Sequence, residues 1–494
     1  MQLNVKRLFP VFLIATLFAF LVGGFIFYIG KPDQSLVRQN DAYFYAAEAR
    51  AHVTQVPITP PVFSTLFTAP ANIYFSYTWL QSLLVPHNGD WYTSLERLRL
   101  FEVFVAGLLA FLVFLVAYDI SGSILAASLG TIVAMEIPIL FRIALDRPEG
   151  LIAIFFLLMV WALIRRKFLM VAILAFAFPL TYSVSIVLLA PAFIYSVSAF
   201  LHGGRKALAS EIPLTLVAFL STCVGILAHP APINYFLNGT WLHLNVFFDV
   251  GGLVQAAEMS APKLVLFEWC WILIFAFTSF LYMRFVYKKS FSALSFPAVF
   301  LTTLTFFLGF MYLHSLRFSN YFFPIFGLWV ASTLGSGFIA SRRASVAYKV
   351  GIVLVLFLAF LVGVRPQYQS MNNQPPLDYY KNTAEFLSKH PGVVVNRFDT
   401  YAPIIFFYPQ AQLTSGRDNV FMAAYDRDLY NFYFKMGIFP PEVIMQGFKA
   451  TYLLDDGRNA RFTKYLGSSK CITATYIDPK YPQVKLYSAI PKCK

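Results

Sequence analysis

The sequence repeats one feature many times, a run of mostly apolar residues long enough to cross a bilayer as a helix. A spanning helix needs about 20 such residues. Runs of this kind lie near residues 8–29, 99–118, 123–143, 150–165, 168–183, 184–201, 212–229, 264–287, 293–313, 321–340 and 349–364. They predict a polytopic α-helical membrane protein with about 11 spans. The 168–201 block is either two short spans hinged at residues 181–183 or one long kinked span.

The charged residues divide the chain into two parts. They make up only 13% of the sequence, against about 25% in an average soluble protein. Residues 365–494 nevertheless carry 16 Lys and Arg and 10 Asp and Glu, which is close to the soluble norm. We therefore expect a transmembrane domain at 1–364, with long outer segments at 30–98 and 230–263, and an α/β domain outside the membrane at 365–494. A soluble enzyme, a disordered chain and a disulfide-rich scaffold are excluded.

Short basic loops alternate with the predicted spans and give the orientation. They hold Lys6 and Arg7, Arg165 to Lys167, Arg205 and Lys206, Lys288 and Lys289, and Arg342 and Arg343 with Lys349. Short loops rich in Lys and Arg are typical of the cytoplasmic side. This predicts a plasma- or inner-membrane protein with a cytoplasmic N-terminus and an extracytoplasmic C-terminal domain. Much of the net charge of +14 then marks topology, and we expect membrane lipid rather than nucleic acid as a partner.

The first outer segment opens with a stretch that has helical spacing. As a helix starting at residue 40 or 41, it would place Asp41, Tyr45, Glu48 and His52 along one face. Asp41 could be an N-cap, with Glu48 and His52 forming a solvated pair. Asp41 and Glu48 could equally be catalytic residues beside the membrane. For His52 the structural interpretation is favoured.

A second charged group lies in the turn Asp146-Arg147-Pro148-Glu149 between two predicted spans. Ionised groups near hydrocarbon are costly unless they pair or bind an ion. The turn can be an Asp146–Arg147 pair followed by a helix-starting Glu149. Alternatively, Asp146 and Glu149 supply oxygen ligands for a hard cation such as Mg²⁺ or Mn²⁺.

Four further residues are candidates on the outer side. Arg317 stands where a late span begins, and its guanidinium could grip a phosphate or extend to the interface. His314 lies in the same turn. Glu258 and Asp90 are weaker candidates for donor or acceptor contacts. Asp90 in particular has the sequence setting of a turn residue.

Two cysteines in the C-terminal domain bracket a predicted hairpin. Cys471 and Cys493 flank the β-rich runs 472–477 and 484–490. A hairpin would bring them together, and an outside compartment permits oxidation. We therefore predict a Cys471–Cys493 disulfide.

The order of these features resembles the GT-C superfamily of membrane glycosyltransferases. The run from Asp146 through Glu149 into an apolar helix is similar to the second acidic motif of oligosaccharyltransferase catalytic subunits. Arg147-Pro148-Glu149-Gly150 also resembles a turn of polyprenyl-phosphate-sugar-dependent transferases. Asp41-Ala42-Tyr43-Phe44 is similar to the first-loop Asp-Pro-Tyr-Tyr of the oligosaccharyl group.

The resemblance implies transfer of a sugar from a polyprenyl-phosphate or diphosphate carrier to a glycan, lipid or protein acceptor on the outer face. Asp41 would be a general base or a cation ligand with Asp146 and Glu149, although the Asp-x-x-Glu spacing leaves the matching ligand open. Arg317 and Arg147 would bind the donor phosphate. The C-terminal domain lacks the Trp-Trp-Asp-Tyr-Gly motif of oligosaccharyltransferases, which favours a broader glycosyltransferase over one that acts on protein.

Two other functions fit parts of the pattern. A transporter or flippase for a lipid-linked or anionic solute would use Glu136, Glu268 and Arg317 inside the bundle. A non-catalytic membrane scaffold would leave the charged turn at 146–149 unexplained. The acids gather on one side and no internal repeat is evident, so the enzyme is the favoured interpretation.

Overall fold

The computed structural model describes residues 5–29, 40–65, 72–86, 90–144, 147–247, 295–334, 375–416, 420–435 and 439–490. The chain divides into two compact units. The helical unit comprises Met1–Gln34, Arg99–Ala228 and Gln255–Asn373. The mixed unit comprises Ser35–Leu98, His229–Val254 and Gln374–Lys494, so it joins both long segments predicted outside the membrane to the C-terminal domain.

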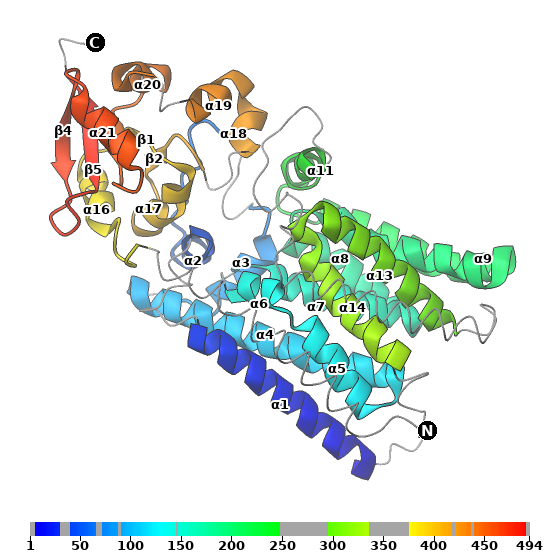
Figure 1. Ribbon diagram of the computed structural model, residues 1–494. Coiled ribbons are helices and arrows are strands. Elements are labelled where there is room, and N and C mark those ends of the chain that lie inside the picture. The colour runs from blue at the N-terminus through cyan, green and yellow to red at the C-terminus, as the bar shows by residue number, and fades with distance from the viewer. Residues whose placement is uncertain are drawn as a thin grey trace. The chain divides into compact units, whose positions relative to one another are not determined.

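The helical unit is built from long apolar helices, which Figure 1 shows in blue, cyan and green. Its elements are α1 (Val5–Ile29), α4 (Trp91–Ser121), α5 (Ile124–Ala134), α6 (Ile137–Ala144), α7 (Glu149–Ile164), α8 (Phe168–Thr181), η1 (Ser185–Leu188), α9 (Leu189–Leu227), α13 (Phe296–His314), η5 (Leu316–Phe318) and α14 (Ser319–Thr333). The first turns of α4 belong to the mixed unit.

Four helical segments in the described part of the chain are long and apolar enough to cross a membrane. They are Phe9–Tyr28, Trp91–Ser121, Ser185–Leu227 and Phe296–His314, and shorter apolar helices include α5, α7 and α8. Predicted spans at 264–287 and 349–364, and the end of 321–340, lie outside the described residues. The count of about 11 spans stays a prediction.

The predicted span at 123–143 is broken into α5 and α6. Pro138 has no N–H to give to the carbonyl of Ala134, and its ring disfavours a continuous helix at that point. Met135 ends the first helix, and Leu140 donates to the carbonyl of Glu136 at the start of the second (3.2 Å). The interpretation of one uninterrupted span is therefore wrong here.

The 168–201 block forms two helices, which resolves the alternative that its sequence left open. Helix α8 ends at Thr181, and Tyr182 is extended (φ −140°, ψ 144°) before the short turn η1 leads into α9. The predicted spans 184–201 and 212–229 are both parts of α9, which kinks at Gly203 and Gly204. Gly204 has φ 64°, a backbone conformation that favours glycine.

Small residues bring helices of this unit into close contact. A Cβ on either Gly130 or Gly327 would collide with the carbonyl oxygen of the other, so α5 and α14 touch backbone to backbone. Helices α1 and α4 lie side by side (Figure 1), where Gly107 faces the carbonyl of Ala19 at 3.0 Å from its ideal Cβ position. Such packing is common between membrane helices, because lipid supplies no hydrophobic drive for their association.

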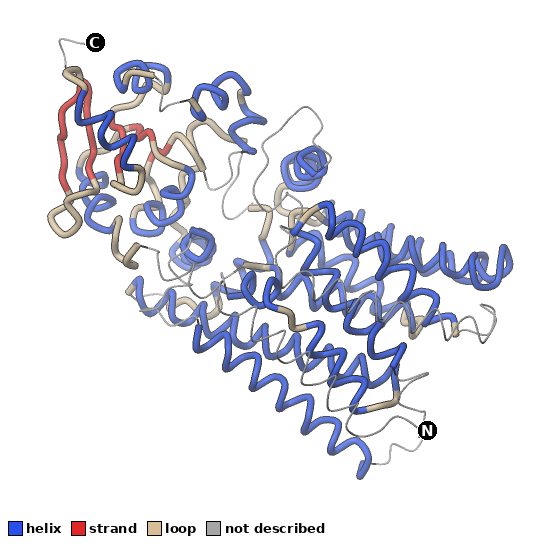
Figure 2. The backbone as a smooth tube through the Cα atoms, in the orientation of Figure 1, coloured by secondary structure: helices blue, strands red, loops and turns tan. Residues whose placement is uncertain are grey.

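The mixed unit combines short helices with one sheet, drawn in red in Figure 2. Its helices are α2 (Asn40–Thr54), α3 (Phe75–Ser82), α10 (Pro232–Asn234), η2 (Tyr235–Trp241), α11 (Leu242–Phe247), α16 (Lys381–Lys389), η7 (Phe398–Thr400), α17 (Tyr401–Phe407), α18 (Val420–Tyr425), α19 (Arg427–Phe434), α20 (Pro441–Gly447) and α21 (Ala460–Ser468). Its strands are β1 (Val393–Val395), β2 (Gln412–Leu413), β3 (Tyr452–Asp455), β4 (Ile472–Ile477) and β5 (Lys485–Ala489).

The sheet has the order β2-β1-β3-β5-β4. Strand β1 runs parallel to both β2 and β3, while β3–β5 and β5–β4 are antiparallel. The β4–β5 pair is the hairpin that the sequence predicts, with a register shift between Ala474 and Tyr476. Parallel strands joined through helices give this domain its α/β character.

The first long segment is part of the same core. Val62 donates to the carbonyl of Leu413 in β2 (2.8 Å), and Thr59 donates to that of Pro409 (2.8 Å). The Phe63 ring packs against Phe448 with centroids 5.7 Å apart. These contacts tie residues 59–63 to the sheet domain more than 300 positions later in the chain.

Candidate functional site

The charged turn of the helical unit forms a buried group that we name the Arg–Glu cluster (Arg142, Arg147 and Glu149). Glu149 opens α7, where the helix dipole favours its negative charge. Its Oε1 lies 3.5 Å from Nη1 of Arg142 and 3.9 Å from Nη1 of Arg147. The three side chains are between 9% and 14% exposed, so the cluster has two cations and one anion in a dry setting.

The second oxygen of Glu149 is available for a ligand. Its Oε2 is buried and has no hydrogen-bond partner within the described ranges. Burying a carboxylate oxygen without a partner is costly, and bound ligands or ions are one way to offset that cost. Asp146, the neighbouring acid that the sequence pairs with Glu149, lies outside the described residues.

Tyr321 in α14 connects this cluster with Arg317. The ring is buried, 4% exposed, and packs on Phe156 of α7 at 4.9 Å between centroids. Its hydroxyl shares a hydrogen bond with Tyr182 and interacts electrostatically with both Glu149 and Arg317. Glu149 and Arg317, which are 168 positions apart in the sequence, thus both act electrostatically on this tyrosine.

Arg317 itself lies in the short turn η5 and is half-buried. Its backbone N–H donates to Oγ of Ser315 (3.4 Å). The neighbouring His314 ends α13 and is exposed. Arg317 is thus only partly shielded from solvent.

Asp41 and Glu48 lie on α2 in the mixed unit, as the helical spacing predicts. The helix begins at Asn40, so Asp41 is its second residue and not its N-cap, although a first-turn carboxylate still suits the helix dipole. Asp41 is 6% and Glu48 0% exposed. The helix packs between α3 and α17.

Glu48 and His52 do not form a solvated pair. Asn72 donates through Nδ2 to Oε2 of Glu48 (2.9 Å) and to Oγ1 of Thr78 (3.1 Å), and Nε2 of His52 bonds the same Thr78 oxygen (3.1 Å). Burial lowers the pKa of His52, so a charge on it is disfavoured. We name this group the Asn72 network, and it gives Glu48 a structural partner.

His229 extends the Asn72 network from another part of the chain. Its Nδ1 accepts from the backbone N–H of Ala231 (3.1 Å), which leaves Nε2 as the donor to the carbonyl oxygen of Asn72 (3.1 Å). Burial lowers the pKa of His229, although the hydrogen bond to the Asn72 carbonyl acts in the other direction. His229, as a neutral imidazole, therefore links the backbone at Asn72 to the backbone at Ala231.

Asp90 has the structural role of a helix cap. It directly precedes α4 and accepts the backbone N–H of Thr93 through Oδ1 (2.6 Å). That hydrogen bond lowers the pKa of Asp90. Its side chain is exposed, and the described contacts are those of a cap.

The remaining predicted residues are only partly described. Cys471 is disulfide-bonded and Cys223 is free. Ile490 donates to the carbonyl of Cys471 (2.8 Å), which brings the chain back beside it. Cys493 and Glu258 lie outside the described residues, so the Cys471–Cys493 pairing stays a prediction.

Within the described residues, no group of three or more His, Cys, Asp or Glu side chains could hold a metal ion. Glu149 offers one buried carboxylate oxygen, while its expected partner Asp146 is not among those residues. The described residues thus supply only part of the oxygen ligands that a hard cation would need.

Sequence reasoning missed several residues of these groups. Arg142 is a charged residue inside a predicted span, and that position alone was a usable signal. Tyr182 and Tyr321 stand among many aromatic residues with nothing to separate them. Asn72 and His229 are joined only by the tertiary fold.

The fold of the chain is similar to that of known proteins. The chain has the fold of GT-C membrane glycosyltransferases, as its likeness to solved archaeal oligosaccharyltransferases shows. Together with the apolar helices, this fold identifies an integral membrane protein.

The particular structures come from Archaeoglobus fulgidus. The oligosaccharyltransferase AglB in complex with an inhibitory peptide and a dolichol-phosphate aligns over 100% of this chain and 75% of its own length, at 12% identity and a TM-score of 0.61. The apo form aligns over 99% and 75%, at 13% identity and a TM-score of 0.63. The form tethered to an acceptor peptide containing the NVT sequon aligns over 98% and 74%, at 14% identity and a TM-score of 0.59. No protein-family model and no curated protein matches the sequence.

Proposed function

We propose that this protein is a membrane glycosyltransferase that takes a sugar from a polyprenyl-phosphate or polyprenyl-diphosphate carrier. The single observation that carries the proposal is the likeness to archaeal oligosaccharyltransferases along essentially the whole chain. One of those relatives was solved with a dolichol-phosphate, a lipid phosphate of the proposed donor class. The grouping of Arg142, Arg147 and Glu149 adds a chemical reason.

The donor phosphate is assigned to the arginines of the helical unit. Arg147 and Arg317 provide guanidinium groups that can bind phosphate oxygens through two parallel N–H bonds. Arg142 also pairs with Oε1 of Glu149. Arg147 is therefore not the sole partner of that carboxylate and can also bind a phosphate. A divalent cation, Mg²⁺ or Mn²⁺, would be held by Glu149 with Asp146 and Asp41, and would stabilise negative charge on the leaving phosphate.

The transfer itself is a substitution at the anomeric carbon. An acceptor hydroxyl or amide attacks that carbon, and the bond from the carbon to the phosphate oxygen breaks. The lipid phosphate leaves with the bonding electrons, and the acceptor proton passes to a base, a role that we assign to Asp41. Glu48 has a weaker claim to this role, because the Asn72 network already occupies one of its oxygens.

We place the reaction on the extracytoplasmic face, with the N-terminus in the cytoplasm. The basic loops support this orientation through the positive-inside rule. The acceptor is a glycan, a lipid or a protein. Because the C-terminal domain lacks a Trp-Trp-Asp-Tyr-Gly motif, and Arg-Phe-Asp-Thr-Tyr at 397–401 does not match it, we favour an acceptor other than a peptide.

The test is direct transfer by the purified full-length protein in lipid nanodiscs. Radiolabelled polyprenyl-phosphate sugars are supplied with an extract of envelope glycans and lipids or with a peptide containing Asn-Val-Thr, each with and without EDTA. Label moving from the lipid to an acceptor supports the proposal. Intact donor in all arms, with a protein that still binds donor lipid, would overturn it.

A transporter is the second candidate, because Glu136 is fully buried at the break between α5 and α6. Broken helices and buried acids are common at transporter sites. Its companion Glu268 lies outside the described residues. Proteoliposomes distinguish the two, since a flippase moves labelled donor lipid between leaflets without cleaving it.

A further inference from the structure

The C-terminal sheet has a feature that the transferase proposal does not use. Strand β1 has parallel neighbours on both sides, β2 and β3. The chain goes from β1 to β2 on one side and later adds β3 on the other, so the strand order reverses at β1. In α/β domains, ligands bind beyond the carboxyl ends of the strands at such a point.

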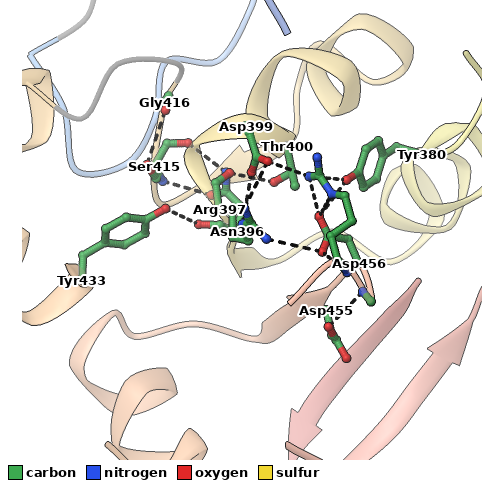
Figure 3. Close-up of polar contacts among 12 residues, drawn as sticks. Tyr380, Asn396, Arg397, Asp399, Thr400, Ser415, Gly416, Tyr433, Asp455 and Asp456 are labelled. Carbon is green, nitrogen blue, oxygen red and sulfur yellow. Dashed lines mark hydrogen bonds and ion pairs between the residues drawn. The ribbon is translucent and has the colours of Figure 1, made fainter. Parts of the chain in front are cut away.

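Four charged residues that pair with one another lie at these carboxyl ends, and we name them the Arg–Asp quartet. Arg397 and Asp399 follow β1, and Asp456 follows β3 (Figure 3). Arg458 comes two positions after Asp456. Asp455, the last residue of β3, instead accepts from Oγ1 of Thr463 (2.9 Å). Arg458 donates from Nε to Oδ2 of Asp456 (2.6 Å) and pairs through Nη2 with Oδ2 of Asp399 (2.9 Å). Arg397 is held more loosely, with Nη2 at 3.3 Å from Oδ2 of Asp399 and Nη1 at 3.9 Å from Asp456.

Neutral hydrogen bonds fix the backbone that carries this quartet. The Asn396 side chain donates to the carbonyls of Arg397 (2.8 Å) and Ser415 (3.0 Å), and accepts the N–H of Ser415 (3.0 Å). Tyr433 donates to the carbonyl of Asn396 (3.0 Å), and Oγ1 of Thr400 donates to that of Arg397 (2.8 Å). These bonds lie around Arg397 in Figure 3. A site built on strand ends and locked in this way is preorganised.

Part of this rigid group is open to solvent. Phe398, between Arg397 and Asp399 in the sequence, is 42% exposed. The Arg397 and Arg458 side chains are 36% and 29% exposed, while that of Asp456 is 2% exposed. The turn that carries Arg397 and Asp399 thus also carries an exposed aromatic residue.

The charge balance selects the ligand class. Two guanidiniums and two carboxylates cancel, so the quartet gives a free anion or cation little net attraction. A sugar hydroxyl both donates and accepts, and can therefore use Asp399 and Arg397 together. The apolar C–H face of a pyranose can cover an aromatic ring such as Phe398, as apolar surface leaves water. From these contacts we propose that the carboxyl ends of β1 and β3 form a binding site for a neutral carbohydrate.

Equilibrium binding tests this site without any transfer reaction. The result is therefore independent of whether the protein is a glycosyltransferase. The full-length protein in nanodiscs is titrated with cellobiose, lactose, mannobiose and chitobiose, and binding is followed by saturation-transfer NMR. Inorganic phosphate and a peptide containing Asn-Val-Thr serve as competing ligand classes. The test variants are Phe398→Ala and Arg397→Gln. Their matched controls are Tyr425→Ala, an exposed aromatic of the same unit, and Lys389→Gln, an exposed cation on α16.

We expect at least one disaccharide to bind at millimolar concentration. Phe398→Ala and Arg397→Gln should each weaken it about tenfold, equivalent to about 1.4 kcal/mol, and the controls should not. Phe398→Ala and both controls should keep the wild-type unfolding temperature because those side chains are exposed, and Arg397→Gln should lower it only slightly because Arg458 still pairs with both carboxylates. The proposal is overturned if no disaccharide binds, if the test variants bind like their controls, or if phosphate or the peptide alone binds in a way that depends on Arg397.

Discussion

The Arg–Glu cluster of the helical unit has two guanidiniums for one carboxylate, whereas the Arg–Asp quartet of the mixed unit has two for two. In the cluster, Glu149 keeps one buried oxygen without a hydrogen-bond partner among the described residues. In the quartet, both Asp456 oxygens face guanidinium groups and the Tyr380 hydroxyl donates to Oδ2 (2.9 Å). The cluster thus has a carboxylate oxygen with neither a hydrogen bond nor an ion pair among the described contacts, whereas all four carboxylate oxygens of the quartet face guanidinium groups.

This difference indicates different ligands. Buried guanidinium groups such as those of Arg142 and Arg147 suit an anion such as a phosphate, and the Glu149 Oε2, which has no hydrogen bond within the described residues, can take a cation that accompanies it. A balanced, hydrogen-bonded quartet gains little from either ion. Its exposed Arg397 and Phe398 suit an uncharged ligand with hydroxyl groups and an apolar face.

The contrast between the two groups is tested most directly by removing the negative charge of the Arg–Glu cluster. Glu149→Gln keeps the shape of the side chain but removes its charge, so cation binding and the balance with Arg142 and Arg147 are lost. We expect glycosyl transfer to fall by about 10²–10³-fold, the loss seen when one electrostatic group of an active site is removed. The measurement is the initial rate of label transfer from the lipid donor.

The control for Glu149→Gln is Asp119→Asn. Asp119 pairs with Arg165 at 2.6 Å in the same unit, but its side chain is 40% exposed. A paired carboxylate that is only structural should change the rate less than twofold. Equal rates in the two variants would remove Glu149 from the site.

The next largest effect is expected at Arg317. Arg317→Ala removes a proposed phosphate contact, and a hydrogen bond to a charged group is worth about 1.5–3 kcal/mol. The donor KM should rise, or kcat/KM for donor should fall, about 10–100-fold, with acceptor saturation unchanged. Arg317→Lys should recover part of the loss through its charge. Loss of donor and acceptor saturation to the same extent would indicate a structural role instead.

Much of the membrane part of the fold could be predicted from the sequence, because apolar length and local breaks are local properties. Helix α2 begins at Asn40, as its spacing predicts, and the β4–β5 hairpin is present. The break before Pro138 was missed although the proline was visible. The apolar run at 123–143 indicated a single span more strongly than Pro138 indicated a break in it.

The charged groups were predicted less well, since their partners are distant in sequence. Arg397 to Tyr401 carried no recognisable motif, and the quartet exists only because β1 and β3 are parallel neighbours. Strand order is decided by packing across the whole domain, so residues 399 and 456 could not be paired from spacing. The electrostatic action of both Glu149 and Arg317 on Tyr321 has the same origin.

The two acids of the quartet should differ in their effect on stability. Burial raises the pKa of Asp456, but Arg458 and Arg397 outweigh it and hold the pKa below the usual value. For Asp399, burial outweighs the same two arginines and the pKa is raised. Asp456→Asn should therefore destabilise the protein by about 2 kcal/mol at neutral pH, since it leaves Arg458 poorly paired, and Asp399→Asn by less.

The pH dependence of unfolding shows whether the ionised form of Asp456 or Asp399 stabilises or destabilises the fold. A lowered pKa stabilises the fold above the ordinary aspartate value of about 3.9, and that stabilisation is lost as pH falls below it. The cost of Asp456→Asn should shrink below about pH 4. A raised pKa has the opposite effect, so ionised Asp399 costs stability as pH rises above that value. Thermal unfolding of both variants between neutral and acid pH measures this, and identical profiles would contradict the assignment.

The smallest effect is expected for a neutral partner of the quartet. Tyr380 donates to Oδ2 of Asp456 (2.9 Å) and accepts from Nη2 of Arg458 (2.8 Å). Tyr380→Phe removes one hydroxyl but leaves the two charged groups paired with each other. The loss in unfolding free energy should be about 1 kcal/mol, the net worth of an ordinary hydrogen bond. If Tyr380→Phe cost more than Asp456→Asn, the quartet would depend on its neutral frame rather than on charge balance, and its contrast with the Arg–Glu cluster would disappear.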